Sequence, residues 1–144
     1  MTYKSALKLV FYLVFAITIF MNALNRILNC IDLDDTKNAK IEINEAYALL
    51  DADSNYFQDN DLETIITFFK DKEGNHFKRV EMLSQLIYYD SLVQKSDFIK
   101  QRKLKKAIAL LEYKNLFSEE YSLELTSKLN QMKNTLLQIT DEKL

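Results

Sequence analysis

The stretch KSALKLVFYLVFAITIFMNALNRILN, from Lys4 to Asn29, is the longest apolar segment of the chain. No charged residue occurs between Lys8 and Arg26, a gap of 17 residues. A helix of about 17 residues is near the lower limit for crossing the roughly 30 Å hydrocarbon core of a bilayer. Length and hydropathy therefore make this segment a candidate membrane span. If it is instead buried in the protein, the other helices must pack against it, so the interpretation of this segment affects the expected fold.

The polar residues of this segment gather on one side when it is drawn as a helix. Three adjacent heptad columns contain nearly all of them: Lys4-Phe11-Thr18-Asn25, Lys8-Phe15-Asn22-Asn29 and Ser5-Tyr12-Ile19-Arg26. The other four columns are wholly apolar: Ala6-Leu13-Phe20-Ile27, Leu7-Val14-Met21-Leu28, Leu9-Ala16-Ala23 and Val10-Ile17-Leu24. This pattern predicts an amphipathic helix with an unusually broad apolar face. A span surrounded by lipid would have no physical reason to segregate its polar residues.

We therefore expect residues 1–30 to form a hydrophobic amphipathic helix that tethers the protein to a membrane, with membrane contact through residues 5–28. The alternative is a helix buried within the domain or within a homodimer, in which case the protein would be cytoplasmic. Export is the weakest interpretation, because Asn22-Ala23-Leu24-Asn25 lacks the small-residue pattern of a cleavage site.

Composition restricts the fold class. The 144 residues include one Gly and no Pro, the two residues that mark the turns of β-rich proteins, so the sequence predicts an all-α fold. The net charge of −2 provides no broad basic surface, and we expect no nucleic-acid partner. The basic run KQRKLKK, residues 100–106, is interpreted as a solvated helix face.

Apolar periodicity predicts five further helices, at about 36–50, 60–70, 76–94, 97–115 and from Ser118 or Ser122 to about 139. Asp34 or Asp35 and Ser96 are candidate N-caps, residues 51–55 read as a loop, and Gly74 suits a left-handed turn. The predicted buried residues are Ala39, Ile43, Ala46, Leu50, Leu62, Ile65, Ile66, Phe69, Phe77, Val80, Leu83, Leu86, Ile87, Leu104, Ala107, Ile108, Leu111, Leu125, Leu129, Met132 and Leu136. Residues 31–144 are expected to form one helical-hairpin domain.

Two segments carry the small-large-small spacing of the second helix of a tetratricopeptide repeat. Ala39, Ile43 and Ala46 match it fully, and Leu104, Ala107 and Leu111 match it in part, with Lys114 at the second small position. Ala39 and Ala107 are 68 residues apart, twice the 34-residue period of that repeat, although a copy midway, beginning at Glu73, is absent. We expect antiparallel helical hairpins of tetratricopeptide-like type.

The segments AKIEINEAYALLDADSNYF, DLETIITFF and AIALLEYKNLFSEEYSLELTSKLNQM, within residues 35–138, resemble a family of small bacterial tetratricopeptide-like proteins. The resemblance implies a helical-hairpin fold. Because the family has no assigned activity, the resemblance implies no catalytic or binding residues.

No motif predicts a catalytic, cofactor or metal site. Residues 51–59 place oxygen ligands at alternate positions like a calcium-binding loop, but Tyr56 replaces the required Gly and Leu62 the closing Glu. We therefore interpret this segment as a polar loop with helix caps. His76 is the sole histidine, expected on the surface at a helix start, and Cys30 is interpreted as a small helical hydrophobe.

These observations favour a non-catalytic module for protein–protein interaction, acting as a membrane-tethered adaptor without a cofactor. The partner would be a protein or peptide held on the concave side of stacked hairpins. Exposed members of an aromatic set could line such a groove: Tyr88, Tyr89, Phe98, Tyr113, Phe117 and Tyr121. The alternatives are a small helical immunity or antitoxin protein and, less favoured, an enzyme without a recognisable motif.

Overall fold

The computed structural model describes residues 2–120 and 122–141, and these residues form seven helices. The helices are α1 (Tyr3–Asp32), α2 (Thr36–Leu49), α3 (Ser54–Asp59), α4 (Leu62–Lys70), α5 (His76–Leu92), α6 (Asp97–Phe117) and α7 (Leu123–Asp141). No strand occurs among the described residues, which confirms the all-α prediction.

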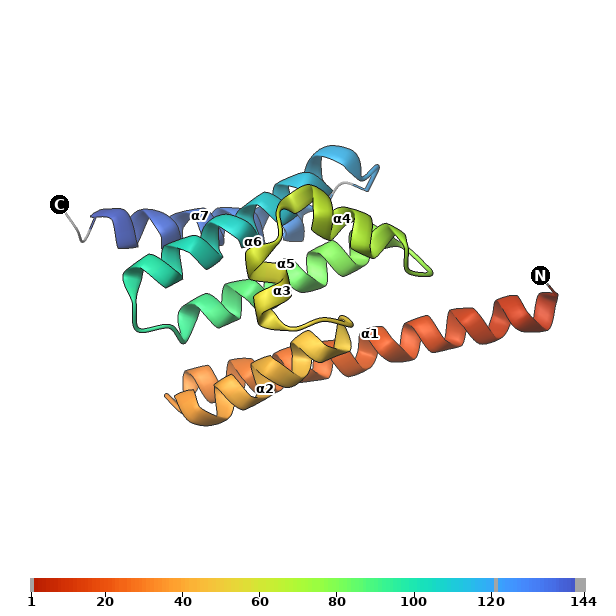
Figure 1. Cartoon of the computed structure of the whole chain (residues 1–144), viewed down its shortest axis with the longest axis horizontal. Coiled ribbons are helices and arrows are strands. Elements are labelled where there is room, and N and C mark those ends of the chain that lie inside the picture. Colours follow the sequence, from red (N-terminus) through yellow and green to blue (C-terminus); the bar gives the residue numbers. More distant parts are fainter. Residues whose placement is uncertain (1, 121, 142–144) are drawn as a thin grey trace.

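The helices form two antiparallel hairpins with further helices packed on them. The first hairpin is α1 and α2, and the second is α5 and α6 (Figure 1). Helix α5 is central, because it packs most extensively on α6 and also contacts α1, α2 and α4, while α7 packs on α6. Helix α1 extends well beyond the other six helices, so its amino-terminal end is the far tip of the molecule (Figure 1).

Small residues on α2, α5 and α6 permit close packing in the core. Ala39, Ala46 and Ala107 are fully buried, and the hydroxyl of Ser84 donates a hydrogen bond of 2.6 Å to the backbone carbonyl of Ala107. A side chain without bulk lets two helix backbones approach closely, so the buried apolar neighbours interdigitate. The predicted core is confirmed apart from Leu62, Phe77 and Leu136, which are only partly buried.

Most helix ends use the caps expected from the sequence. The carboxylate of Asp35 accepts from the backbone amide of Asn38, and Ser96 caps α6 in the same way. The Ser122 hydroxyl accepts from the amide of Leu125 at 3.3 Å, so Ser122 rather than Ser118 begins the last helix. Gly74 has a φ of +93°, as the predicted left-handed turn requires.

The prediction of a loop at residues 51–55 is wrong at its second half, because Ser54 begins the short helix α3. Asp53 caps this helix by accepting from the amide of Tyr56 at 2.8 Å. Phe57 is fully buried among Tyr47, Phe68 and Phe69, and it anchors the helix. A helix of six residues contains too few turns to show an apolar period in the sequence. Its burial depends on contacts with residues elsewhere in the chain.

The interpretation of residues 100–106 as a solvated face is also wrong in part. The Lys103 ammonium is buried and donates to Asp90 Oδ2 on α5 at 2.8 Å. Tyr47 donates to the same oxygen at 2.7 Å, and Gln94 donates to Asp90 Oδ1 at 2.8 Å. Burial, with the adjacent Asp90 charge, raises the pKa of Tyr47 well above its ordinary value, so the phenol stays protonated as a donor.

Lys106, in the same run, serves as a cap for α3 from another helix. Its ammonium donates to the backbone carbonyls of Phe57, Gln58 and Asn60, where α3 ends. These carbonyls have no partner within so short a helix, and a cation there also complements the helix dipole. Partial burial lowers the pKa of Lys106.

Replacing Lys103 by Met should destabilise the fold strongly. The substitution leaves the buried Asp90 carboxylate without its cation, a change that typically costs about 3–5 kcal/mol of unfolding free energy. Urea denaturation followed by circular dichroism measures the loss. The exposed neighbour Lys105, replaced by Met in the same way, should stay within about 0.5 kcal/mol of the wild type. Equal stability of the two variants would contradict a stabilising role for the Lys103–Asp90 pair.

Candidate functional site

Helix α1 carries two apolar stripes on different faces. The first stripe packs on α2 and α5, and its members are Leu13, Ile17, Phe20, Leu24 and Ile27. The second stripe, which we call the free stripe, lies on an adjacent face and consists of Leu7, Val10, Phe11, Val14 and Met21. The spacings are three and four residues in the first stripe and one, three and seven in the second, and each set lies on one side of the helix. The broad apolar face predicted from the sequence is therefore half buried and half exposed.

The free stripe and the side chains around it are unusually exposed for their apolarity. Val10, Phe11 and Val14 expose 55%, 67% and 57% of their surface. Tyr12 and Phe15 expose 68% and 64%, so the helix is apolar nearly all round at this level. Large contiguous apolar surface on a soluble domain marks a contact with a membrane or another protein.

By length and composition, α1 is the one helix among the described residues that could cross a membrane. Only 17% of its most apolar window is buried inside the structure, whereas the core helix of a soluble domain would be mostly buried. The amino-terminal half thus differs from the carboxy-terminal half, where Phe20, Ala23, Leu24 and Ile27 are buried in the core.

The point at which α1 leaves the other helices is marked by Leu13 and Gly74. A Cβ atom on Gly74 would lie 3.1 Å from a δ-carbon of Leu13, so the glycine allows the α4–α5 connection to touch α1. Ten residues of α1, from Tyr3 to Tyr12, precede this contact and extend about 15 Å at 1.5 Å per residue. Lys4 and Lys8 lie in this projecting part and are both exposed.

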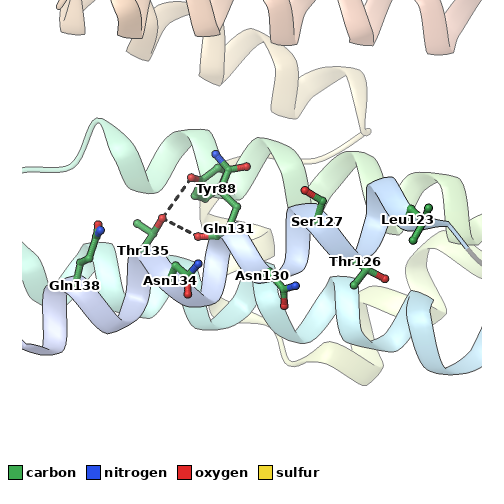
Figure 2. Close-up of a pocket in the computed structure, with 9 residues that line it drawn as sticks. All are labelled: Tyr88, Leu123, Thr126, Ser127, Asn130, Gln131, Asn134, Thr135 and Gln138. Carbon is green, nitrogen blue, oxygen red and sulfur yellow. Dashed lines mark hydrogen bonds between the residues drawn. The ribbon is translucent and has the colours of Figure 1, made fainter.

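A second candidate region is an open groove of about 690 Å³ along α7. Figure 2 shows its nine lining residues, eight on α7 and Tyr88 on α5, and none of them is charged. The Tyr88 hydroxyl lies 3.4 Å from that of Thr135, which donates to the backbone carbonyl of Gln131 at 2.9 Å. The amides of Asn130, Asn134 and Gln138 supply both donors and acceptors, which suits the backbone of an extended peptide.

Two other polar clusters in the described part of the chain make contacts that hold helices together. A cavity of about 250 Å³ borders Asp90 and Lys103, but both groups are already engaged in the buried network with Tyr47. His76 begins α5, is half-buried rather than at the surface, and lies with Nε2 3.1 Å from the Tyr113 hydroxyl. Burial and the nearby Lys70 lower the pKa of His76, so its ring is neutral near pH 7.

The other residues considered as functional candidates in the sequence cap a helix, pack against the core or lie on the surface. Asp53 is the cap of α3, and no group of three or more His, Cys, Asp or Glu within residues 2–120 and 122–141 is placed to hold a metal ion. Cys30 is partly buried against the core. Of the aromatic set, Phe98 and Phe117 are exposed, Tyr88 is buried, and Tyr89 and Tyr113 are partly buried. Tyr121 lies outside the described residues.

Comparisons of the chain with protein-family models, with curated proteins and with solved structures found no match. The chain is a small all-helical protein whose candidate sites are two surfaces, the free stripe of α1 and the α7 groove.

Glu81 connects helices α5, α6 and α7 through ion pairs. Its carboxylate on α5 accepts from Lys114 of α6 at 2.5 Å and lies within 3.8 Å of Lys128 of α7 and 3.7 Å of Lys78. Burial raises the pKa of Glu81, but the hydrogen bond from Lys114 and the three positive charges outweigh it, so the pKa lies below its ordinary value.

Replacing Glu81 by Gln should lower the unfolding free energy at pH 7 by about 1–3 kcal/mol, because charge-assisted hydrogen bonds are lost. Since the pKa of Glu81 is lower in the folded state, its contribution is present above the ordinary value of 4.5 and disappears as the pH falls through the folded value. Urea titrations at pH 7 and at several values below 4.5 should show the two proteins converging on acidification. Glu119→Gln, at an exposed position, is the control.

Proposed function

We propose that this protein is a non-catalytic helical adaptor that associates with a membrane surface through α1 and holds a protein partner on its other helices. The observation that supports membrane association most directly is the free stripe, because helix-spaced apolar side chains are exposed along one face of α1. Transfer of such side chains from water to hydrocarbon is favourable by up to about 1.5–3 kcal/mol each.

The length of the projecting part favours a helix lying in the interface over a helix that crosses the bilayer. About 15 Å projects beyond Leu13, roughly half of the hydrocarbon thickness of about 30 Å. Axial insertion would also place the ammonium groups of Lys4 and Lys8 inside the hydrocarbon, which is costly. A helix lying flat buries the free stripe and lets both lysine side chains reach the head groups.

The remaining helices are proposed to act as a tetratricopeptide-like docking module. The antiparallel pairs α1–α2 and α5–α6 and the buried alanines at the predicted small positions support this comparison. The α7 groove, with uncharged donors and acceptors, is the surface best suited to an extended peptide. Membrane association would then position this groove beside a membrane-bound partner.

Replacing the three most exposed members of the free stripe, together with the neighbouring Phe15, should nearly abolish membrane binding. The variant with Val10, Phe11, Val14 and Phe15 all changed to Ser should partition onto phosphatidylcholine vesicles at least about a hundredfold less, because most of the buried apolar area is lost. Sedimentation with vesicles measures the partition coefficient. The fold should survive, since all four side chains are more than half exposed.

A matched control replaces four exposed apolar residues outside α1, Leu33, Ile41, Phe98 and Ile99, by Ser, and should leave vesicle binding unchanged. Failure of the wild-type protein to bind vesicles would overturn the proposal. So would a lipid-free dimer, seen by analytical ultracentrifugation, that dissociates in the α1 variant, because a second copy would then cover the free stripe.

The α7 groove can be tested with a photo-crosslinking amino acid at Asn134 in cells that naturally make the protein. We expect a discrete protein adduct that disappears when Asn130 and Gln138, on the same face, are replaced by Arg. The same crosslinker at the exposed Lys105 of α6 should not give this adduct. An adduct that is insensitive to the two Arg substitutions would contradict a partner in the groove.

A further inference from the structure

A partly open cleft of about 210 Å³ lies where α1 leaves the other helices. Its apolar side includes Tyr12 and Ala16 of α1 and Leu49 at the end of α2, and its polar side includes Asn75, Lys78 and Arg79 at the start of α5. The volume corresponds to about seven water molecules at ~30 Å³ each. One wall of the cleft is thus apolar and continuous with the exposed part of α1, and the other carries two cations. The carboxylate of Asp51, paired with Lys72 at 3.8 Å, also lines the cleft.

The two cations of the cleft differ in their partners. Lys78 lies 3.7 Å from Glu81, which it shares with Lys114 and Lys128. Arg79 is half-buried and makes no ion pair with any residue in the described part of the chain. Its guanidinium is therefore available to an external oxyanion, and the planar fork of donors suits a phosphate with two parallel hydrogen bonds.

Two residues with positive φ lie near the cleft: Asp51 lines it, and Gly74 directly precedes the lining residue Asn75. Asp51, with a φ of +69°, follows α2 and lies 3.8 Å from Lys72, and Gly74, with a φ of +93°, precedes α5. A Cβ atom on Gly74 would lie 3.1 Å from Leu13 and 3.7 Å from Nη1 of Arg79. The absence of a side chain at Gly74 thus lets Leu13 of α1 pack against the α4–α5 connection, next to the Arg79 guanidinium.

We propose that this cleft binds an anionic phospholipid, with the phosphate on Arg79 and the start of an acyl chain against Tyr12, Ala16 and Leu49. This inference rests on the proposed membrane association and specifies the lipid. The apolar wall favours an amphiphile over a free phosphate ion, because an inorganic anion would leave that wall without a partner. The cleft opens beside the projecting part of the helix, on the side of α1 that carries Tyr12 and Ala16.

Vesicle binding by the full chain tests the charge requirement. On vesicles of phosphatidylcholine mixed with phosphatidylglycerol, Arg79→Gln should weaken binding about fivefold or more, and on phosphatidylcholine alone it should have little effect. Arg102→Gln makes the same change in net charge at an exposed position near the start of α6 and should match the wild type on both. Arg79→Lys keeps the positive charge but lacks the planar guanidinium donors, and it should lose part of the preference for vesicles that contain phosphatidylglycerol.

Equal losses for Arg79→Gln and Arg102→Gln would show a diffuse charge effect and overturn the cleft as a site. An unchanged Arg79→Gln variant, in a protein whose vesicle binding still requires the free stripe, would overturn the cleft and leave membrane association intact. If the wild-type protein does not bind vesicles of either composition, the proposed function itself is overturned, which is a separate result.

Nuclear magnetic resonance distinguishes the lipid from its phosphate. Titration of the full chain with short-chain phosphatidylglycerol, below its micelle concentration, should shift the side-chain signals of Arg79 and Asn75. Inorganic phosphate at equal concentration should shift them much less. Equal shifts with both ligands, or none with the lipid, would overturn the assignment of the cleft to a phospholipid.

Discussion

The structure depends on one constraint: α1 has more apolar surface than the other helices can cover. Its carboxy-terminal half supplies Phe20, Leu24 and Ile27 to the core, where each is nearly or fully buried. The projecting part, Tyr3–Tyr12, has no helix beside it, so its members of the free stripe, Leu7, Val10 and Phe11, stay exposed (Figure 1). The proposed membrane interface would supply an apolar environment for the exposed end of this helix.

The second feature of the fold is the use of lysine as a connector between helices. Lys103, Lys106 and Lys114 on α6 each bring an ammonium group to acceptors on another element: Asp90, the end of α3, and Glu81. A long aliphatic stem crosses apolar surface while the head group reaches its acceptor. Breaking such a buried pair costs far more than breaking a surface pair. These contacts, together with the apolar packing between α5 and α6, fix how the two helices are oriented.

Most of the helices could be predicted from the sequence, because periodic burial of residues such as Ile43, Leu83 and Leu111 is a local property. The role of Lys103 could not be predicted, because a lysine on a solvated face and a lysine facing a buried Asp90 have the same local pattern. Helix α3 was missed for a similar reason. Six residues give no period, and Phe57 is buried only because α2 and α4 bring Tyr47 and Phe69 to it.

The candidate surfaces could be predicted only in part. The heptad columns of residues 4–29 show an excess of apolar faces, but which column is buried depends on where α2 and α5 pack, and this arises from residues far away in the chain. The α7 groove consists of Asn, Gln, Ser and Thr side chains, which in a sequence resemble any solvated helix face. The cleft at Arg79 joins α1, α2 and α5, so no local pattern marks it.

The way α1 is held also bears on the choice between lying on a membrane and crossing it. A crossing helix would need the uncharged residues 9–25, and that range includes Phe20, Ala23 and Leu24, which are buried in the core. Withdrawing them would expose the facing surfaces of α2 and α5 and cost roughly 2 kcal/mol or more for each large side chain. Lipid would solvate the removed side chains but not the cavity they leave behind. In the proposed peripheral association, the docked helix would bury the free stripe at an interface while the core stays intact, so both apolar stripes of α1 would leave water.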